Sequence, residues 1–287
     1  MKRLYSKIAQ LGGWLGFADF CIFKTLIETQ NELQNKNPLC EIGVHHGKSF
    51  IPMVLFSEGS TCHCVDVFEN QKLNIDRSGK GDFRRFYSNL SKFNIEMDRV
   101  IIHKIYSTEL NRSDLCKPTQ SIRFFHIDGG HNFKVVSSDL TLALECSDKN
   151  SVIAIDDVCR SEWIEVSEGV FSLYSMLEDY EFTYLAFGFN KLYLCHKSMI
   201  STYQKSLYTC KHLNAFLSKK YSVERNPSLP LPIYSCFPLP EWSISRFLIN
   251  FVQIKYPYIY ISIYPLIAAK QKVKQRLKNL IMGNNYQ

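Results

Sequence analysis

The sequence predicts an α/β fold built on a doubly wound, mostly parallel sheet. Short apolar runs alternate with polar or helical segments along the first two thirds of the chain, a pattern typical of βαβ units. Two of these runs end in acid, one at Asp128 and one at Asp156 and Asp157. Because ligands bind beyond the carboxyl ends of the strands in open α/β sheets, we expect a functional site at that edge.

The expected elements follow one another in βα order. A helical pattern over residues 17–35 leads into an apolar run at 39–43, and Gly47-Lys48-Ser49 then opens a further helix. Two closely spaced runs are separated by Gly188-Phe189-Asn190 and predict a hairpin at the edge of the sheet. The other predicted strands cover residues 61–67, 100–103, 122–127 and 151–155, and the hairpin strands cover 182–187 and 191–196.

The pattern weakens beyond residue 197, and five of the ten prolines fall between Pro227 and Pro240. We therefore expect an N-terminal helical segment (1–35), a main domain (36–200), a linker or cover (201–240) and a basic, apolar tail (241–287). Polar residues and prolines interrupt the apolar stretch at 247–269, so a transmembrane span is not expected. The amphipathic segment at 270–281 fits an interfacial helix on anionic lipid, or equally a helix packed on the domain or a partner.

Charge and cysteine content limit the classes of partner. The formal net charge is +7, but seven Lys or Arg against one acid lie from Glu241 onward, so the rest of the chain is nearly neutral. A nucleic-acid partner is therefore not expected. The ten cysteines are scattered, mostly in apolar runs, without a cleavable secretory signal, which predicts reduced thiols and a cytoplasmic location. Cys62-His63-Cys64 has no second ligand pair at zinc spacing.

The turn after the first strand predicts a cofactor site. Its pattern, Glu41-x-Gly43-x-x-x-Gly47, differs from Gly-x-Gly-x-x-Gly and disfavours a pyrophosphate. It suits a phosphate-free cofactor with a cationic amino-acid end, which Glu41 would attract while the glycines permit close backbone approach. Asp66 ends the next strand, where an acidic residue would bind ribose hydroxyls. A glutamate and two glycines are common in turns, so the prediction depends on the order of all these features.

On these motifs the chain resembles the class I S-adenosylmethionine-dependent methyltransferases, and more closely the small-molecule and sugar O-methyltransferase branch. The resemblance covers roughly residues 36–200 and implies a Rossmann-like fold. It also implies that Glu41, Gly43 and Gly47 line the methionine end of the cofactor, that Asp66 holds its ribose, and that Ser107 contacts the adenine. The motifs are Glu41-Ile42-Gly43-Val44-His45-His46-Gly47-Lys48-Ser49, Val65-Asp66-Val67-Phe68-Glu69, His126-Ile127-Asp128-Gly129-Gly130-His131 and Ile155-Asp156-Asp157-Val158, continued by Trp163, Gly169-Val170 and Phe189-Asn190-Lys191.

The strand-end acids predict a metal site. Asp128, Asp156 and Asp157 offer hard oxygen ligands that suit Mg²⁺ or Mn²⁺, and a divalent ion bound to a sugar hydroxyl would lower its pKa and fix its position. The chain resembles metal-dependent catechol-type and macrolide-sugar O-methyltransferases at these positions. Helix capping by Asp157 is the alternative interpretation of the acid pair.

The catalytic candidates are His131 and Asp128. His131 lies near the expected N-terminus of a helix, whose dipole favours the neutral imidazole, so we expect it to act as the general base. The alternative for a lone histidine is a satisfied surface or core residue.

Together these features predict an S-adenosylmethionine-dependent O-methyltransferase acting on a hydroxyl of a sugar in a glycan, glycolipid or glycosylated metabolite, with assistance by Mg²⁺ or Mn²⁺. A homo-oligomer is compatible with the sequence, and the tail predicts peripheral contact at the inner membrane face. One alternative is an oxygenase-like relative that holds iron, although a 2-His-1-carboxylate pattern is not evident. The other is a non-catalytic binding module, which would have no need to retain Glu41, Gly43, Gly47 and Asp66.

Overall fold

The computed structural model describes residues 1–224 and 234–238, together with isolated positions between 248 and 262. The chain divides into two compact units, Met1–Phe237 and Pro238–Gln287. All elements discussed below belong to the first unit, except that the last residue of one strand, Pro238, belongs to the second. In the described part of the chain no helix is long and apolar enough to cross a membrane. The basic amphipathic segment expected at 270–281 lies outside the described residues, as does most of the apolar stretch before it.

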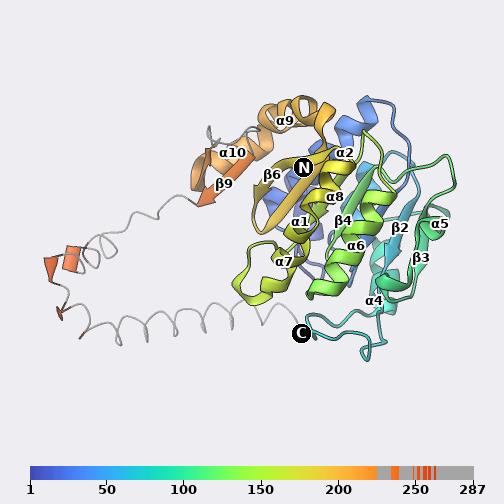
Figure 1. The fold of residues 1–287 in the computed structure, drawn as a ribbon, viewed down its shortest axis with the longest axis horizontal. Coiled ribbons are helices and arrows are strands. Elements are labelled where there is room, and N and C mark those ends of the chain that lie inside the picture. Colours follow the sequence, from blue (N-terminus) through green and yellow to red (C-terminus); the bar gives the residue numbers. More distant parts are fainter. Residues whose placement is uncertain are drawn as a thin grey trace. The chain divides into compact units, whose positions relative to one another are not determined.

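The described strands form one sheet in the order β3-β2-β1-β4-β5-β7-β6-β9-β8 (Figure 1). The first five are parallel, as the sequence predicts. The chain order reverses at β1, which pairs with β2 on one side and with β4 on the other, so the switch point of the doubly wound sheet lies between β1 and β4. The five strands are β1 (Leu39–Ile42), β2 (Cys62–Val65), β3 (Val100–His103), β4 (Phe124–Ile127) and β5 (Val152–Ile155).

The predicted hairpin is also confirmed. Strands β6 (Phe182–Gly188) and β7 (Lys191–His196) are antiparallel, and β7 pairs with β5. The sheet continues beyond the hairpin, because β9 (Tyr234–Pro238) pairs in parallel with β6 and β8 (Tyr221–Glu224) follows β9 in the strand order. This pairing places the first residue of β7 beside the carboxyl end of β5, where the predicted acids lie.

Helices cover both faces of the sheet because alternate strand residues pack to opposite sides. Leu39 and Phe124 belong to one core layer, whereas their neighbours Cys40 and Phe125 belong to the other. The first layer contains α1 (Lys2–Ile8), α2 (Phe17–Glu32), α3 (Phe50–Phe56), α4 (Phe83–Lys92), α9 (Ile200–Thr209) and residues of α10 (Lys211–Lys220). The second contains α5 (Arg112–Leu115), α6 (Phe133–Glu145), α7 (Ile164–Ser172) and α8 (Tyr174–Asp179). Short 3-10 helices occupy Met97–Arg99, Ser107–Glu109, Ser161–Trp163 and Lys197–Met199.

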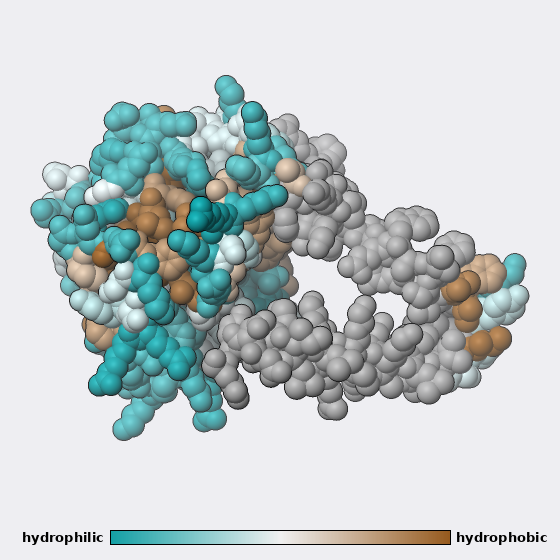
Figure 2. Space-filling view, turned by 180° about the vertical axis from the view of Figure 1, so that it is seen from behind, coloured by the Kyte–Doolittle hydropathy of each residue, from teal (hydrophilic) through white to brown (hydrophobic). Residues whose placement is uncertain are grey.

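Helices α9 and α10 lie in the segment expected to be a linker or cover. Helix α9 contacts α2 and β6, and it buries Ile200, Tyr203 and Leu207. The prolines that suggested a linker begin only at residue 227, after both helices. The compact unit accordingly continues to Phe237. On the face seen in Figure 2, hydrophilic residues surround a hydrophobic patch near the centre of this unit.

A fully buried arginine anchors the N-terminal helical segment to the sheet. The Arg123 guanidinium, next to the start of β4, donates hydrogen bonds to Asn31 Oδ1 in α2 (2.8 Å) and to the carbonyl oxygens of Asn37 (3.0 Å) and Ser57 (2.9 Å). Burial lowers its pKa to about 10, so it remains protonated at neutral pH. Because unpaired polar groups are costly inside a protein, this network fixes the position of α2 against the sheet.

Candidate functional site

The predicted site residues meet at the carboxyl edge of β1, β4 and β5. The Asp128 amide donates to the Ile42 carbonyl (2.8 Å) and the Asp156 amide donates to the Ile127 carbonyl (2.9 Å), so the ladder continues into both acids. Gly43 lies so close to the next strand that a Cβ there would come within 1.8 Å of the Asp128 carbonyl oxygen, and its φ is +88°. Glycine is therefore required at position 43.

Two pockets open at this edge and share Gly43, Ser78, Gly79 and Asp128. The first extends along the ends of β2 and β3 and is covered by residues of the 71–81 loop. The second has a volume of about 670 Å³ and reaches from the start of α2 to the β6–β7 turn. Because the pockets share these four residues, a molecule in the first and a molecule in the second would lie next to each other at this point.

Three of the five predicted cofactor residues line the first pocket, namely Gly43, Asp66 and Ser107. The Asp66 carboxylate accepts hydrogen bonds from the backbone amides of His45 (2.7 Å) and Phe68 (2.6 Å). These bonds hold the loops after β1 and β2 together. Burial raises the pKa of Asp66, and the two amide bonds oppose that shift.

The other two, Glu41 and Gly47, do not line either pocket. Glu41 is fully buried within β1, and Gly47 has a φ of +87° and packs against Phe86. Glu41 therefore belongs to the buried part of β1, and Gly47 belongs to the turn that precedes α3.

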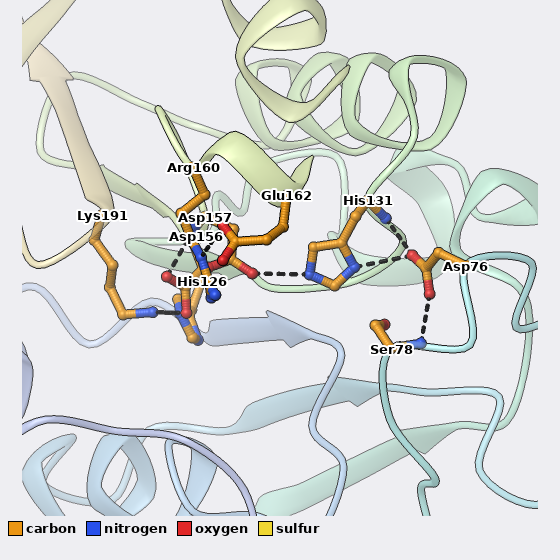
Figure 3. Close-up of polar contacts among 9 residues, drawn as sticks. All are labelled: Asp76, Ser78, His126, His131, Asp156, Asp157, Arg160, Glu162 and Lys191. Atoms are coloured by element: carbon orange, nitrogen blue, oxygen red, sulfur yellow. Dashed lines mark hydrogen bonds and ion pairs between the residues drawn. The ribbon is translucent and has the colours of Figure 1, made fainter. Parts of the chain in front are cut away.

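Polar side chains with little exposure lie beneath the site, and Figure 3 shows Lys191, His126 and Asp156 among them. Lys191 Nζ lies 3.0 Å from His126 Nε2 and forms an ion pair with Asp156. His126 Nδ1 lies 2.6 Å from Glu41 Oε1. The ammonium donates to Nε2, so the imidazole proton is on Nδ1 and is donated to Glu41. Burial lowers the pKa of His126 well below its usual value, in agreement with a neutral ring.

His131 lies between two carboxylates (Figure 3). Its Nδ1 is 2.9 Å from Asp76 Oδ2 and its Nε2 is 3.0 Å from Asp157 Oδ2. Burial alone would lower the pKa of His131, but the bonds to Asp157 and Asp76 raise it to about 9. The two bonded acids therefore disfavour the neutral imidazole that the dipole of the following helix predicts, and they favour the charged ring. The indole ring of Trp163 stacks on the imidazole with centroids 4.5 Å apart.

Two members of this cluster were missed by sequence reasoning. Asp76 belongs to the loop between β2 and α4 and also accepts from the His131 backbone amide (2.6 Å). Arg160 donates to Asp157 Oδ1 at 2.8 Å. Both residues sit in polar segments without periodicity, so no sequence signal distinguishes them. The Asp157 carboxylate pairs with His131 and Arg160 and does not cap a helix. These contacts argue against helix capping as the role of this acid.

We expect His131→Gln to destabilise the protein more near pH 6 than above pH 9. The pKa of His131 is about 9 in the folded protein and about 6.5 when unfolded, so its stabilisation is complete below about pH 6.5 and is lost as the pH rises through 9. The full effect is about 3 kcal/mol. Urea unfolding of wild type and variant at the two pH values measures it, with the exposed His212→Gln as control. An equal loss of stability at both pH values would contradict the assignment.

The predicted metal ligands do not form one cluster. Within residues 1–215, whose side chains are described, donor atoms close enough to share an ion fall into two sets: His126, Asp128 and Asp156, and Asp128, His131 and Asp157. In the first set, His126 and Asp156 already contact the Lys191 ammonium, and in the second both His131 nitrogens are bonded to carboxylates. The arrangement therefore does not fit a divalent ion held jointly by Asp128, Asp156 and Asp157. Cys62 and Cys64 point to the same face of β2, and neither of the two donor sets in the described residues includes them.

Comparison with known proteins agrees with this geometry. Residues 40–158 match the family model of a methyltransferase domain. This part of the chain is therefore similar to a methyltransferase domain. The search of curated proteins found no match. Among solved structures, the O-methyltransferase NovP is 13% identical with a TM-score of 0.53, covering 63% of this chain and 80% of its own, which supports the same fold.

Two further structures are similar at lower scores. An O-methyltransferase from Bacillus cereus in complex with SAH is 16% identical, covering 67% of this chain and 86% of its own, with a TM-score of 0.49. The TDP-rhamnose 3'-O-methyltransferase CalS11 is 14% identical, covering 63% and 81%, with a TM-score of 0.46. The matched methyltransferase domain contains Gly43, Asp66 and Asp128, whereas Arg160, Trp163 and Lys191 follow it in sequence.

Proposed function

We propose that the protein is an S-adenosylmethionine-dependent O-methyltransferase that acts on a hydroxyl of a sugar in a glycan, glycolipid or glycosylated metabolite. The main support is that two pockets meet at Asp128, at the carboxyl edge of a methyltransferase domain. One pocket would hold the methyl donor and the other the acceptor, so the methyl group would pass beside this carboxylate.

The first pocket is proposed to bind the nucleoside part of the cofactor. Asp66 offers carboxylate lone pairs to ribose hydroxyls, and Ser107 lies where the adenine would end. Gly43 lets the cofactor approach the backbone between β1 and β4. Glu41 would act indirectly, through the buried hydrogen bond that holds His126.

The second pocket is proposed to bind the sugar. Its volume of about 670 Å³ lies within the usual range for small-molecule sites. Trp14 and Trp163 offer apolar ring faces, while Asp157 and Arg160 offer polar groups to hydroxyls. This combination suits an acceptor with an apolar ring face and a polar edge.

Transfer is proposed to occur in line. The acceptor oxygen forms a bond to the methyl carbon as the carbon–sulfur bond breaks, which leaves a neutral thioether, and the hydroxyl proton passes to the Asp128 carboxylate. Burial and the neighbouring Asp156 raise the pKa of Asp128 well above its usual value, which makes it a stronger base. His131 was the expected base, but its raised pKa and two bonded nitrogens suit it to hold positive charge beside the acceptor.

Assistance by Mg²⁺ or Mn²⁺ finds little support, because cationic side chains already pair with Asp156 and Asp157. Neither donor set in the described part of the chain contains two histidines, which disfavours the iron-dependent alternative. Contact of the tail with the cytoplasmic membrane face and formation of a homo-oligomer stay predictions.

Calorimetric titration with S-adenosylmethionine and S-adenosylhomocysteine tests the proposal. We expect wild type to bind both, and Asp66→Ala to bind at least roughly tenfold more weakly, because a charge-assisted hydrogen bond to ribose is lost. Asp98→Ala, which removes an exposed acid away from the pockets, is the control and should bind as wild type does. Folded wild-type protein that binds neither ligand would leave the non-catalytic binding module as the better interpretation.

A further inference from the structure

The side chain of Lys191 occupies an unusual position for a cation. It extends from the first residue of β7 into the interior, where only 3% of the side chain is exposed, and it reaches the second pocket from below. Nζ contacts His126 Nε2 at 3.0 Å and the Asp156 carboxylate (Figure 3). A buried ammonium is costly unless it is paired and hydrogen-bonded, so its partners explain why it can lie there.

Three carboxylates surround this ammonium. Asp156, Asp128 and Asp19 all stabilise its charged form, and together they raise the pKa of Lys191 although burial alone would lower it. Asp19 comes from α2 and also accepts a hydrogen bond from the Tyr193 hydroxyl (3.1 Å). The charge of Lys191 is thus stabilised by Asp128 and Asp156, which follow β4 and β5, and by Asp19 of α2.

The same place has the donor geometry of a metal site. One atom each of His126, Asp128 and Asp156 lie within 4.8 Å of one another, and Lys191 Nζ lies at hydrogen-bonding distance from two of these residues. A divalent ion would have to displace an ammonium that is covalently attached to the sheet. Two cations at this distance would also repel each other strongly in a medium of low polarity.

We propose that the Lys191 ammonium is the resident cation of the site, that it occupies the place a divalent ion would take between His126, Asp128 and Asp156, and that it positions the two acids for transfer without a metal. The inference rests on the proposed function and deepens it. Lys191 acts as a positioning residue, because its Nζ contacts His126 and Asp156. The proton of the acceptor hydroxyl passes to Asp128 and not to Lys191.

Binding of Mn²⁺ to the full chain tests this proposal. Electron paramagnetic resonance of the free ion measures the binding, and thermal melting measures the stabilisation that it causes. Wild type is expected to bind no Mn²⁺ at micromolar concentrations and to melt at the same temperature with Mn²⁺ as with a chelator. Lys191→Ala removes the ammonium and opens its space, so it is expected to bind Mn²⁺ at least roughly tenfold more tightly than wild type and to be stabilised by it.

Lys191→Met is the matched control, because it removes the same charge and fills most of the same space. We expect this variant to lose stability as Lys191→Ala does, but to gain no Mn²⁺ binding. The difference between the two variants separates occupation of a cation site from a general loss of packing. If Lys191→Ala does not fold, the wild-type titration decides.

Micromolar binding of Mn²⁺ by wild type would overturn the proposal, as would a folded Lys191→Ala variant that binds no Mn²⁺. These measurements need neither cofactor nor acceptor, so they stand apart from the proposed function. Absence of S-adenosylmethionine binding by wild type would remove the methyltransferase assignment and leave the Mn²⁺ results to be interpreted for another reaction. Methyl transfer by wild type that is unchanged by a chelator would support both the methyltransferase assignment and the role of Lys191 as the resident cation.

Discussion

Asp128→Asn is expected to abolish most methyl transfer while the protein remains folded and still binds the cofactor. The substitution keeps the shape of the side chain but removes the base at the junction of the two pockets. General-base catalysis contributes about 10²- to 10⁴-fold to rates, so we expect a loss within that range. The rate of S-adenosylhomocysteine formation with an accepted sugar measures the loss, and calorimetry measures cofactor binding.

The control for this variant is Asp179→Asn, the same chemical change at an exposed residue at the end of α8. It should keep the wild-type rate. Because burial raises the pKa of Asp128, the wild-type rate should also rise with pH as this carboxyl loses its proton. If Asp128→Asn binds cofactor normally and retains most of the rate, the proton is taken by another group and the proposed role is wrong.

The second large effect is expected for Gly43→Ala, which should abolish cofactor binding and destabilise the fold. The new Cβ would come 1.8 Å from the Asp128 carbonyl oxygen, a distance that requires β1 or the loop after β4 to move. Backbone atoms cannot yield as a flexible side chain can, so we expect a loss of about 3 kcal/mol or more in unfolding free energy. Urea unfolding and calorimetric titration with S-adenosylhomocysteine measure the two effects.

Gly59→Ala provides a matched control. Gly59 has a φ of +90°, nearly the same as the +88° of Gly43, but nothing lies within 4 Å of a Cβ at that position. This variant therefore has only the cost of a left-handed backbone, about 1–2 kcal/mol, and should bind cofactor normally. Equal losses in the two variants would mean that backbone strain, and not the contact with Asp128, makes glycine necessary at residue 43.

Much of the fold could be predicted from the sequence because its signals are local. Apolar runs end at glycine or acid, and in a parallel sheet those ends meet at one edge, so Gly43, Asp66 and Asp128 could be placed together without a structure. The hairpin could be predicted for the same reason. Helices α9 and α10 could not, since their burial depends on contacts with α2 and the hairpin and not on a strong pattern of their own.

By itself, the sequence determined the parallel sheet, the edge at which the acids gather and the residue types available there. Only the tertiary structure decided which charges compensate one another. Lys191 reaches Asp156 and His126 because β7 lies beside β5, and Asp76 reaches His131 because the loop after β2 folds across the site. Such pairings depend on distances between groups 35 to 65 residues apart in the chain, and electrostatic energy follows those distances, which no local pattern encodes.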